Sequence, residues 1–295
     1  NSHIPCLLAH PKVQLLWACD SNAEQLKKIE DTYGVGIYHS DNIHAGLEQI
    51  DIALLSLPVG ARGQYYEMCA GKKIALYVEK PFARTLREHD EIAGKFQEGH
   101  ITIGYNRRAY KNTFALKYVY SSGMFGRLAK IAIRQGFYKL SGYSGYRLNT
   151  NLAGGGVLIE SGIHLIDTVN AIIDATDFNL DDLNMLAFER RDYHTEAYGL
   201  IQNRVEEIET VIQVSTLQNF ASGIWFEFET CTLHYPMSPE LPISIRNKKN
   251  KIVGTLNLDI RGASTVNDSL IRTWDECIES FYQRRSLGVS PSNTR

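Results

Sequence analysis

The first hundred residues alternate short, near-continuous apolar runs with segments in which apolar residues recur at helical spacing. Such runs are typical of strands buried on both faces, and the segments between them of helices that cover a parallel sheet. The predicted strands are residues 13–19, 51–56, 74–78 and 101–104, and the predicted helices are residues 22–33, 61–70 and 84–96. The pattern therefore indicates an open α/β domain, whose ligands should lie at the carboxyl ends of the strands.

Beyond residue 106 the pattern changes to longer helices and extended segments in series. Helices are predicted at 112–121, from the glycines at 154–156 to about residue 175, and at 267–283, and extended segments at 128–137, 184–190, 195–201, 207–215, 223–229, 241–246 and 251–256. Consecutive strands joined by short turns predict a mostly antiparallel sheet. We therefore expect an α/β domain over residues 1–106 and an α+β domain over residues 107–295, with helices on one face of its sheet.

The composition narrows the classes of function. Hydrophobic residues make up 44% of the 295 residues and charged residues 22%, and the net charge is −2. Because no long basic run is present, we expect no nucleic-acid partner. No apolar stretch approaches the roughly 20 residues that a membrane span needs, so we expect no membrane partner either. The five cysteines are scattered and form no C-x-x-C pair, which favours reduced thiols in a cytoplasmic protein over disulfides or a zinc site.

Lys80 follows a predicted buried strand directly, where the ligand crevice of an α/β domain should lie. Pro81 disfavours a helical conformation at Lys80, so the amine can project from the strand end. Glu79 lies beside it and can orient the amine or contact a cofactor. The alternative interpretation is a solvated lysine in an ordinary strand-to-loop turn.

A second group of polar residues lies on a predicted helix that is otherwise apolar. Glu160, His164 and Asp167 are spaced i, i+4, i+7 and should share one narrow face. That face must meet water, a partner or an active-site cleft, and the glycines at 154–156 permit close backbone approach at the helix start. Histidine has a pKa suited to a general base. The spacing of Glu160 and His164 also suits a metal, but no second histidine cluster accompanies them, so we expect no metal site.

The two groups together resemble the Gfo/Idh/MocA family, which includes glucose–fructose oxidoreductase and inositol dehydrogenase. The resemblance rests on Glu79-Lys80-Pro81 and on the glycine run that leads to Glu160, His164 and Asp167. Supporting matches are Ser56-Leu57-Pro58 and Gly104-Tyr105-Asn106-Arg107-Arg108. The resemblance implies a Rossmann-like, dinucleotide-binding first domain, with a sugar-like substrate held between the two domains of an NAD(P)-dependent oxidoreductase.

The resemblance also implies roles for individual residues. His164 would take the hydroxyl proton while Lys80 polarises the alcohol oxygen, with Glu160 as the third catalytic group. The expected cofactor-binding residues are Asp20, Ser21, Ser56, Leu57, Pro58, Glu79, Lys80 and Asn106, and the expected substrate-binding residues are Lys80, Arg107, Arg108, Glu160, His164 and Asp167. Arg107, Arg108 and the nearby tyrosines (Tyr138, Tyr143 and Tyr146) suit a phosphate or a carboxylate. Because Asp20 ends a predicted strand where an acidic residue meets the adenosine ribose, we expect NAD in preference to NADP.

Two departures from the family pattern leave alternatives open. Glu160 stands where the family has aspartate, and no Gly-rich dinucleotide motif occurs in the sequence. Residues 1–5 look like the segment that follows this motif, so we expect the first strand and Gly-rich loop to be missing from residues 1–295. The alternatives to a sugar dehydrogenase are an NAD-retaining glycoside hydrolase of the same family and a non-catalytic binding protein on the same fold. The resemblance also implies a homo-oligomer.

Overall fold

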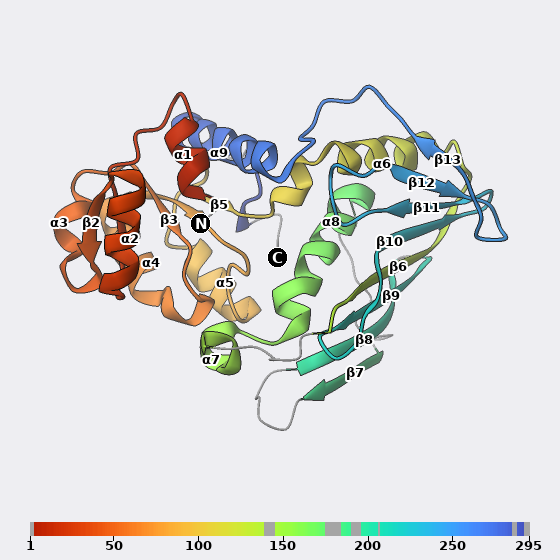
Figure 1. Ribbon diagram of the computed structural model, residues 1–295, viewed down its shortest axis with the longest axis horizontal. Coiled ribbons are helices and arrows are strands. Elements are labelled where there is room, and N and C mark those ends of the chain that lie inside the picture. The colour runs from red at the N-terminus through yellow and green to blue at the C-terminus, as the bar shows by residue number, and fades with distance from the viewer. Residues whose placement is uncertain are drawn as a thin grey trace.

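The computed structural model describes residues 3–138, 145–174, 184–189, 196–205, 207–284 and 288–291. These residues form two lobes, with the N-terminal helices and parallel strands in one and a broad sheet in the other (Figure 1). The predicted fold class, a Rossmann-type parallel part followed by an α+β part with a large sheet, is confirmed.

The first lobe alternates strands and helices as the sequence predicts. Its elements are α1 (His3–Ala9), β1 (Trp17–Asp20), α2 (Ala23–Tyr33), β2 (Gly36–His39), α3 (His44–Leu47), β3 (Ile52–Leu55), α4 (Gly63–Lys72), β4 (Ala75–Val78), α5 (Leu86–Ala93) and β5 (Ile101–Ile103). Helix α2 begins where the Asn22 side chain accepts hydrogen bonds from two backbone N–H groups and ends at Gly34, which has φ 67°. Strand β4 is buried along its whole length, as a central parallel strand should be.

The strands of the first lobe do not form one continuous sheet. β1 pairs with β2, and β3, β4 and β5 form a separate three-stranded sheet, all in parallel register. The predicted parallel strands thus lie in two sheets, because no strand of the described chain pairs with both β1 and β3. The sequence pattern also did not predict α1 or β2, each of which is too short to show a clear periodicity.

The second lobe is built on an eight-stranded sheet. Its elements are α6 (Lys111–Ser122), β6 (Leu128–Gly136), α7 (Thr150–Ala153), a π-helical turn η5 (Leu158–Gly162), α8 (Ile163–Ile173), β7 (Asn184–Glu189), β8 (Glu196–Val205), β9 (Ile208–Ser215), β10 (Phe220–Phe228), β11 (Thr232–Tyr235), β12 (Ile243–Arg246), β13 (Ile252–Leu256) and α9 (Val266–Gln283). The strand order is β13-β12-β11-β10-β6-β9-β8-β7, and every pair except β6–β9 is antiparallel. Strand β11 was not predicted, because it is four residues long and follows β10 after a tight turn.

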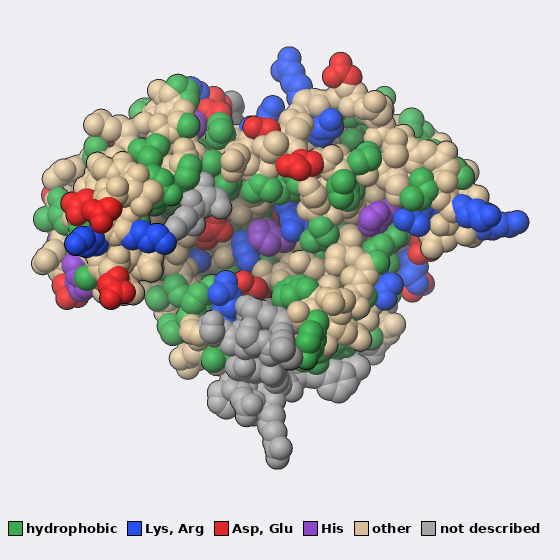
Figure 2. Space-filling view, in the orientation of Figure 1, with side chains coloured by type: hydrophobic (Ala, Val, Ile, Leu, Met, Phe, Trp, Pro, Cys, Tyr) green, Lys and Arg blue, Asp and Glu red, His purple; other side chains and the backbone are tan. Residues whose placement is uncertain are grey.

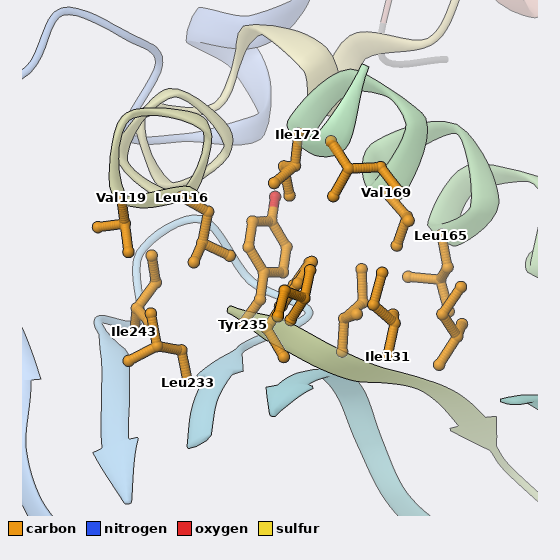
Figure 3. Packing of buried hydrophobic residues seen from close by; sticks show 14 of the residues in the cluster. Leu116, Val119, Ile131, Leu165, Val169, Ile172, Leu233, Tyr235 and Ile243 are labelled. Carbon is orange, nitrogen blue, oxygen red and sulfur yellow. The ribbon is translucent and has the colours of Figure 1, made fainter. Parts of the chain in front are cut away.

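Helices α6 and α8 cover one face of this sheet (Figure 3). Leu116 of α6, Leu165 of α8 and Ile131 of β6 are fully buried members of one hydrophobic cluster. Tyr235 of β11 is also fully buried, and its hydroxyl lies 3.0 Å from the Thr113 hydroxyl. Packing of this kind contributes most of the stability of a domain and holds α8 at a fixed position between the lobes.

One helical stretch, Thr150–Ile173, is long and apolar enough by length and composition to span a membrane. The expectation that no such stretch exists is thus corrected. Half of its most apolar window is buried inside the protein, with Val169 and Ile172 packed on the sheet. This is the behaviour of the core helix of a folded domain.

Helix α9 returns to the first lobe, where it lies beside α1 (Figure 1). Trp274 stacks on Tyr77 of β4 with ring centroids 4.5 Å apart, and the two form a cluster with Cys277 and Leu7. The division at residue 106 stays a prediction, and the last helix of the chain contributes to the core of the lobe that precedes this division.

Candidate active site

Lys80 lies two residues beyond the end of β4 and faces the second lobe. Its Nζ donates a hydrogen bond to the backbone carbonyl of Glu160, 2.6 Å away, so the two predicted groups meet although 80 residues separate them. Figure 2 shows a hollow between the lobes in which basic, acidic and histidine side chains gather. Burial lowers the pKa of the Lys80 amine, and the charges of Glu160 and Glu79 partly oppose this shift. The contact removes the alternative interpretation of Lys80 as a solvated lysine.

Arg62 holds the backbone on both sides of Lys80. Its Nη1 donates to the carbonyls of Glu79 and Pro81 at 2.6 and 2.5 Å, and its Nε and Nη2 donate to the carbonyl of Leu57 at 2.8 and 2.5 Å. The side chain is only 2% exposed. Arg62 therefore joins the loop after β3 to the loop after β4. No sequence signal distinguishes it from a surface arginine.

Replacing Arg62 with methionine should lower the free energy of unfolding by about 2–4 kcal/mol. The change leaves three buried carbonyl oxygens without a charged donor. Urea denaturation measures the loss, with Arg87→Met as the matched control, because the Arg87 side chain is 88% exposed. A loss smaller than about 1 kcal/mol would show that these contacts do not stabilise the loops.

The Glu79 side chain is held by α1 and does not point freely into the hollow. His3 Nε2 lies 2.6 Å from Glu79 Oε1, and Trp274 Nε1 donates to His3 Nδ1 at 3.3 Å. Because Nδ1 accepts a hydrogen bond, the proton of a neutral His3 ring is on Nε2 and is donated to Glu79. Glu79 thus ties the end of β4 to α1 and α9.

Glu160, His164 and Asp167, predicted to share a polar face, lie in two kinds of helix. Glu160 lies in the π-helical turn η5, whereas His164 and Asp167 lie in α8, and each of the three side chains has a different neighbour. The wider π turn changes the angle between positions 160 and 164, which spacing alone does not reveal. The expectation of a shared face stays a prediction.

His164 is the member of this group whose environment suits proton transfer. Burial lowers the pKa of its imidazole well below 6.5, and the positive charges of Lys80 and Arg107 lower it further. Its Nδ1 is buried and has no hydrogen-bond partner among the residues described. The Tyr105 ring meets the imidazole edge to face, with centroids 6.3 Å apart. His164 is therefore neutral at physiological pH and able to accept a proton.

The two carboxylates beside His164 are already paired. Arg147 Nε donates to Glu160 Oε1 at 3.0 Å. Arg108 donates to both oxygens of Asp167, at 2.6 to 3.0 Å. Burial raises the pKa of the Asp167 carboxyl, and Arg108 opposes that shift. The geometry favours a role for Asp167 and Arg108 in fixing α8 to the lobe junction over the predicted role in binding substrate.

The expected cofactor-binding residues lie at the strand ends. Asp20 is the last residue of β1, and its Oδ1 accepts a hydrogen bond from the Asn22 N–H at 2.9 Å. Ser21 follows it, with its carbonyl oxygen 3.1 Å from His39 Nε2. Ser56 is exposed just after β3.

Three further residues were expected to contact the cofactor, and two of them already form hydrogen bonds within the protein. Half-buried Leu57 and Pro58 continue the loop after β3, and the Leu57 carbonyl is taken by Arg62. Asn106 donates through Nδ2 to the Ser269 hydroxyl at 3.1 Å, which ties the lobe junction to α9.

The glycine run ahead of η5 makes room for another side chain. The N–H groups of Gly156 and Leu158 donate to the two carboxylate oxygens of Glu196, at 2.7 and 3.0 Å. A Cβ on Gly156 would lie 2.0 Å from the Glu196 carbonyl oxygen. Glu196 of β8 therefore caps the start of this helical segment. The glycine run was predicted to permit close backbone approach, and at Gly156 the group that approaches is Glu196.

Over the described parts of the chain, no group of three or more His, Cys, Asp or Glu side chains is placed to hold a metal ion. Of the tyrosines suggested for an anion, Tyr146 lies beside Arg147, with the guanidinium carbon 5.0 Å from the ring centroid. Tyr138 is exposed, and Tyr143 lies outside the described residues.

Known structures resemble the whole chain. An aldose–aldose oxidoreductase from Caulobacter crescentus, complexed with glycerol, superposes with a TM-score of 0.81 at 16% identity, over 98% of this chain and 88% of its own. A levoglucosan dehydrogenase complexed with NADH and levoglucosan has a TM-score of 0.79 at 11% identity, over 99% and 88% of the two chains. The WlbA dehydrogenase from Bordetella pertussis, complexed with NADH and UDP-GlcNAcA, has a TM-score of 0.72 at 18% identity, over 96% and 78%. At such identities the likeness establishes the fold.

A match in sequence covers the first lobe. A search of the curated proteins finds no match. Residues 1–106 match the profile GFO_IDH_MocA, described as an oxidoreductase family with an NAD-binding Rossmann fold. These residues include Lys80 and the loops that Arg62 holds together, so the first lobe carries the predicted resemblance to the Gfo/Idh/MocA oxidoreductases.

Proposed function

We propose that the protein is an NAD-dependent dehydrogenase that oxidises or reduces a hydroxyl-bearing or keto carbon of a sugar, a cyclitol or a nucleotide sugar. The observation that carries the proposal is the contact of Lys80 Nζ with the Glu160 carbonyl, beside a neutral His164. The contact joins Lys80 of the first lobe, a hydrogen-bond donor, to the helical segment of the second lobe that carries His164, a proton acceptor. Neighbours of the same fold that act on aldoses or levoglucosan support the substrate class.

The chemistry divides between the two residues. Lys80, protonated, donates a hydrogen bond to the alcohol oxygen and stabilises the negative charge that develops there. His164, neutral, accepts the hydroxyl proton. The carboxylate of Glu160, held by Arg147, is available to a substrate hydroxyl. A bound nicotinamide ring supplies the hydride acceptor or donor.

The residues at the strand ends fit a dinucleotide. Asp20 uses one carboxylate oxygen for the Asn22 N–H, which leaves the other to accept a hydrogen bond from an adenosine ribose hydroxyl. Ser56, Leu57 and Pro58 lie after β3 and would contact the nicotinamide half beside Lys80. Glu79 and Asn106 use their side chains to fix α1 and α9, so we expect them to shape the site instead of contacting the cofactor.

We predict that NADH binds at least tenfold more tightly than NADPH. The Asp20 carboxylate would face the 2′-phosphate with like charge, an unfavourable contact of about 1–3 kcal/mol. No arginine follows among Ser21 and Asn22 to neutralise it. Fluorescence titration with both cofactors measures the ratio, and Asp20→Asn should reduce it. Equal or tighter binding of NADPH would contradict this role of Asp20.

A direct test of the proposal is net formation of NADH from NAD⁺ and a panel of aldoses, cyclitols and UDP-sugars, followed by absorbance. We expect steady turnover with at least one class, and loss of that turnover in Lys80→Ala. Release of free sugar from a glycoside with no net change in NADH would instead favour an NAD-retaining hydrolase. Absence of any reaction, with NADH still bound, would favour a binding protein.

A further inference from the structure

Arg107 is a half-buried cation at the lobe junction, in the short helix η3 (Asn106–Ala109). The contact recorded for its guanidinium is with the Met237 sulfur, 3.8 Å from Nη1. A thioether is a weak acceptor and carries no charge. Burial lowers the pKa of the Arg107 guanidinium. Among the described residues no carboxylate forms an ion pair with it.

The carboxylates near Arg107 are committed to other partners. Ion pairs join Glu160 to Arg147 and Asp167 to Arg108, and the Glu79 carboxylate accepts a hydrogen bond from His3. Lys80 donates to a backbone carbonyl and is likewise without a carboxylate within ion-pair distance in the described parts of the chain. The hollow therefore carries an excess of positive charge.

Arg107 is also close to the groups that would react. On one side of it, the Tyr105 ring meets the His164 ring with centroids 6.3 Å apart, and on the other side Arg108 pairs with Asp167 of α8. Arg107 thus lies in a segment that contacts the helix of His164 on both sides, and its charge lowers the pKa values of Lys80 and His164. The sequence suggested both Arg107 and Arg108 as residues that bind an anion. Because Arg108 donates to Asp167, Arg107 is the better candidate.

We propose that Arg107 binds the carboxylate of the substrate, and that the substrate is a sugar acid or a related polyhydroxy acid. The planar guanidinium offers two parallel N–H donors to the two oxygens of a carboxylate. A phosphate carries more negative charge and a third oxygen, and would need a second arginine. Among the described residues, the arginines Arg108 and Arg147 already donate to Asp167 and Glu160. The inference names the substrate class of the proposed dehydrogenase and rests on that proposal for the reaction. The binding of the acid does not depend on it.

Calorimetry on the full chain with bound NADH tests the binding. The probes are D-glucuronate and D-gluconate, each compared with a neutral partner, D-glucose or D-glucitol. We expect the acids to bind at least tenfold more tightly than the neutral compounds. Arg107→Met should weaken acid binding by about 30- to 1,000-fold and change neutral binding by less than about threefold, the range for losing one partner of a buried charge pair. Arg87→Met is the control and should change neither.

The thermal stability of Arg107→Met separates a binding role from a structural one. Removing a buried charge that has no counter-ion should leave the unfolding temperature unchanged or higher. A clear fall in that temperature would assign Arg107 to the fold and overturn the inference. Equal affinity for acids and neutral sugars, or tighter binding of inorganic phosphate than of the acids, would also overturn it.

Turnover measurements distinguish the two proposals. If the acids bind through Arg107 but no NADH forms from any of them, the dehydrogenase proposal fails while the binding inference stands. If NADH forms from neutral sugars as fast as from the acids, and Arg107→Met leaves kcat/KM unchanged, the binding inference fails while the dehydrogenase proposal stands.

Discussion

Replacing Lys80 with alanine is expected to lower kcat by about 10²- to 10³-fold, with little change in the affinity for NADH. A fixed cationic donor at a developing oxyanion is worth this much in rate. Lys80 is fixed on both sides, since Arg62 binds the carbonyls of Glu79 and Pro81. The pH profile adds a second readout. Lys80 must be protonated to donate a hydrogen bond, and burial lowers its pKa below 10.5. Activity should therefore fall as the pH rises through this lowered pKa, at a pH below 10.5.

Two comparisons control the Lys80 experiment. Lys249→Ala, at an exposed turn between β12 and β13, should keep full activity. Circular dichroism and urea denaturation should show that Lys80→Ala stays folded. If the variant keeps more than half of its turnover, Lys80 is not part of the chemistry.

His164→Asn should lower the rate of alcohol oxidation by about 10²- to 10⁴-fold, the contribution of a positioned general base. The base must be neutral to accept a proton. Because burial and the charges of Lys80 and Arg107 lower the pKa of His164 well below 6.5, the wild-type rate should stay constant down to pH values below 6.5 and fall only at more acidic pH. In His164→Asn this acid limb should disappear, since asparagine does not titrate.

A wild-type acid limb centred at or above pH 6.5 would contradict the environment that the structure gives His164. An unchanged limb in the asparagine variant, at a normal rate, would assign the limb to another group. His44→Asn, on α3 in the first lobe, is a suitable control, because His44 is exposed and far from α8 in the chain.

The sequence was sufficient for most of the longer elements and for the two groups that meet in the hollow. Buried strands followed by polar residues place Lys80 at a strand end, and apolar periodicity places His164 on a core helix. Both signals are local and have a fixed period, so they can be recognised in the sequence without knowledge of the tertiary structure. The division of the first-lobe strands into the β1–β2 pair and the β3–β4–β5 sheet depends on pairing between strands that are distant in sequence. No local sequence pattern specifies such pairing.

The partners of the site residues could not be predicted for the same reason. The Lys80 amine meets a backbone carbonyl, Asp167 meets Arg108 across 59 positions, and Arg62 is buried although nothing nearby in the sequence indicates it. The π-helical turn at Glu160 adds a residue to one helical turn, and the spacing i, i+4 looks the same with or without it. Arg107 and Arg108 are adjacent in sequence, yet only their partners show which of them is available to a ligand.

Transfer of deuterium tests most directly the claim that the reaction is a hydride transfer at the hollow of Lys80 and His164. The wild-type protein is incubated with NAD⁺ and a sugar or sugar acid that carries deuterium on the oxidised carbon, and the product cofactor is analysed by mass spectrometry. We predict one deuterium in each NADH formed, with the rate of deuterium transfer lowered at least about 100-fold in Lys80→Ala and in His164→Asn. NADH without deuterium, or an unchanged rate of transfer in both variants, would contradict the assignment.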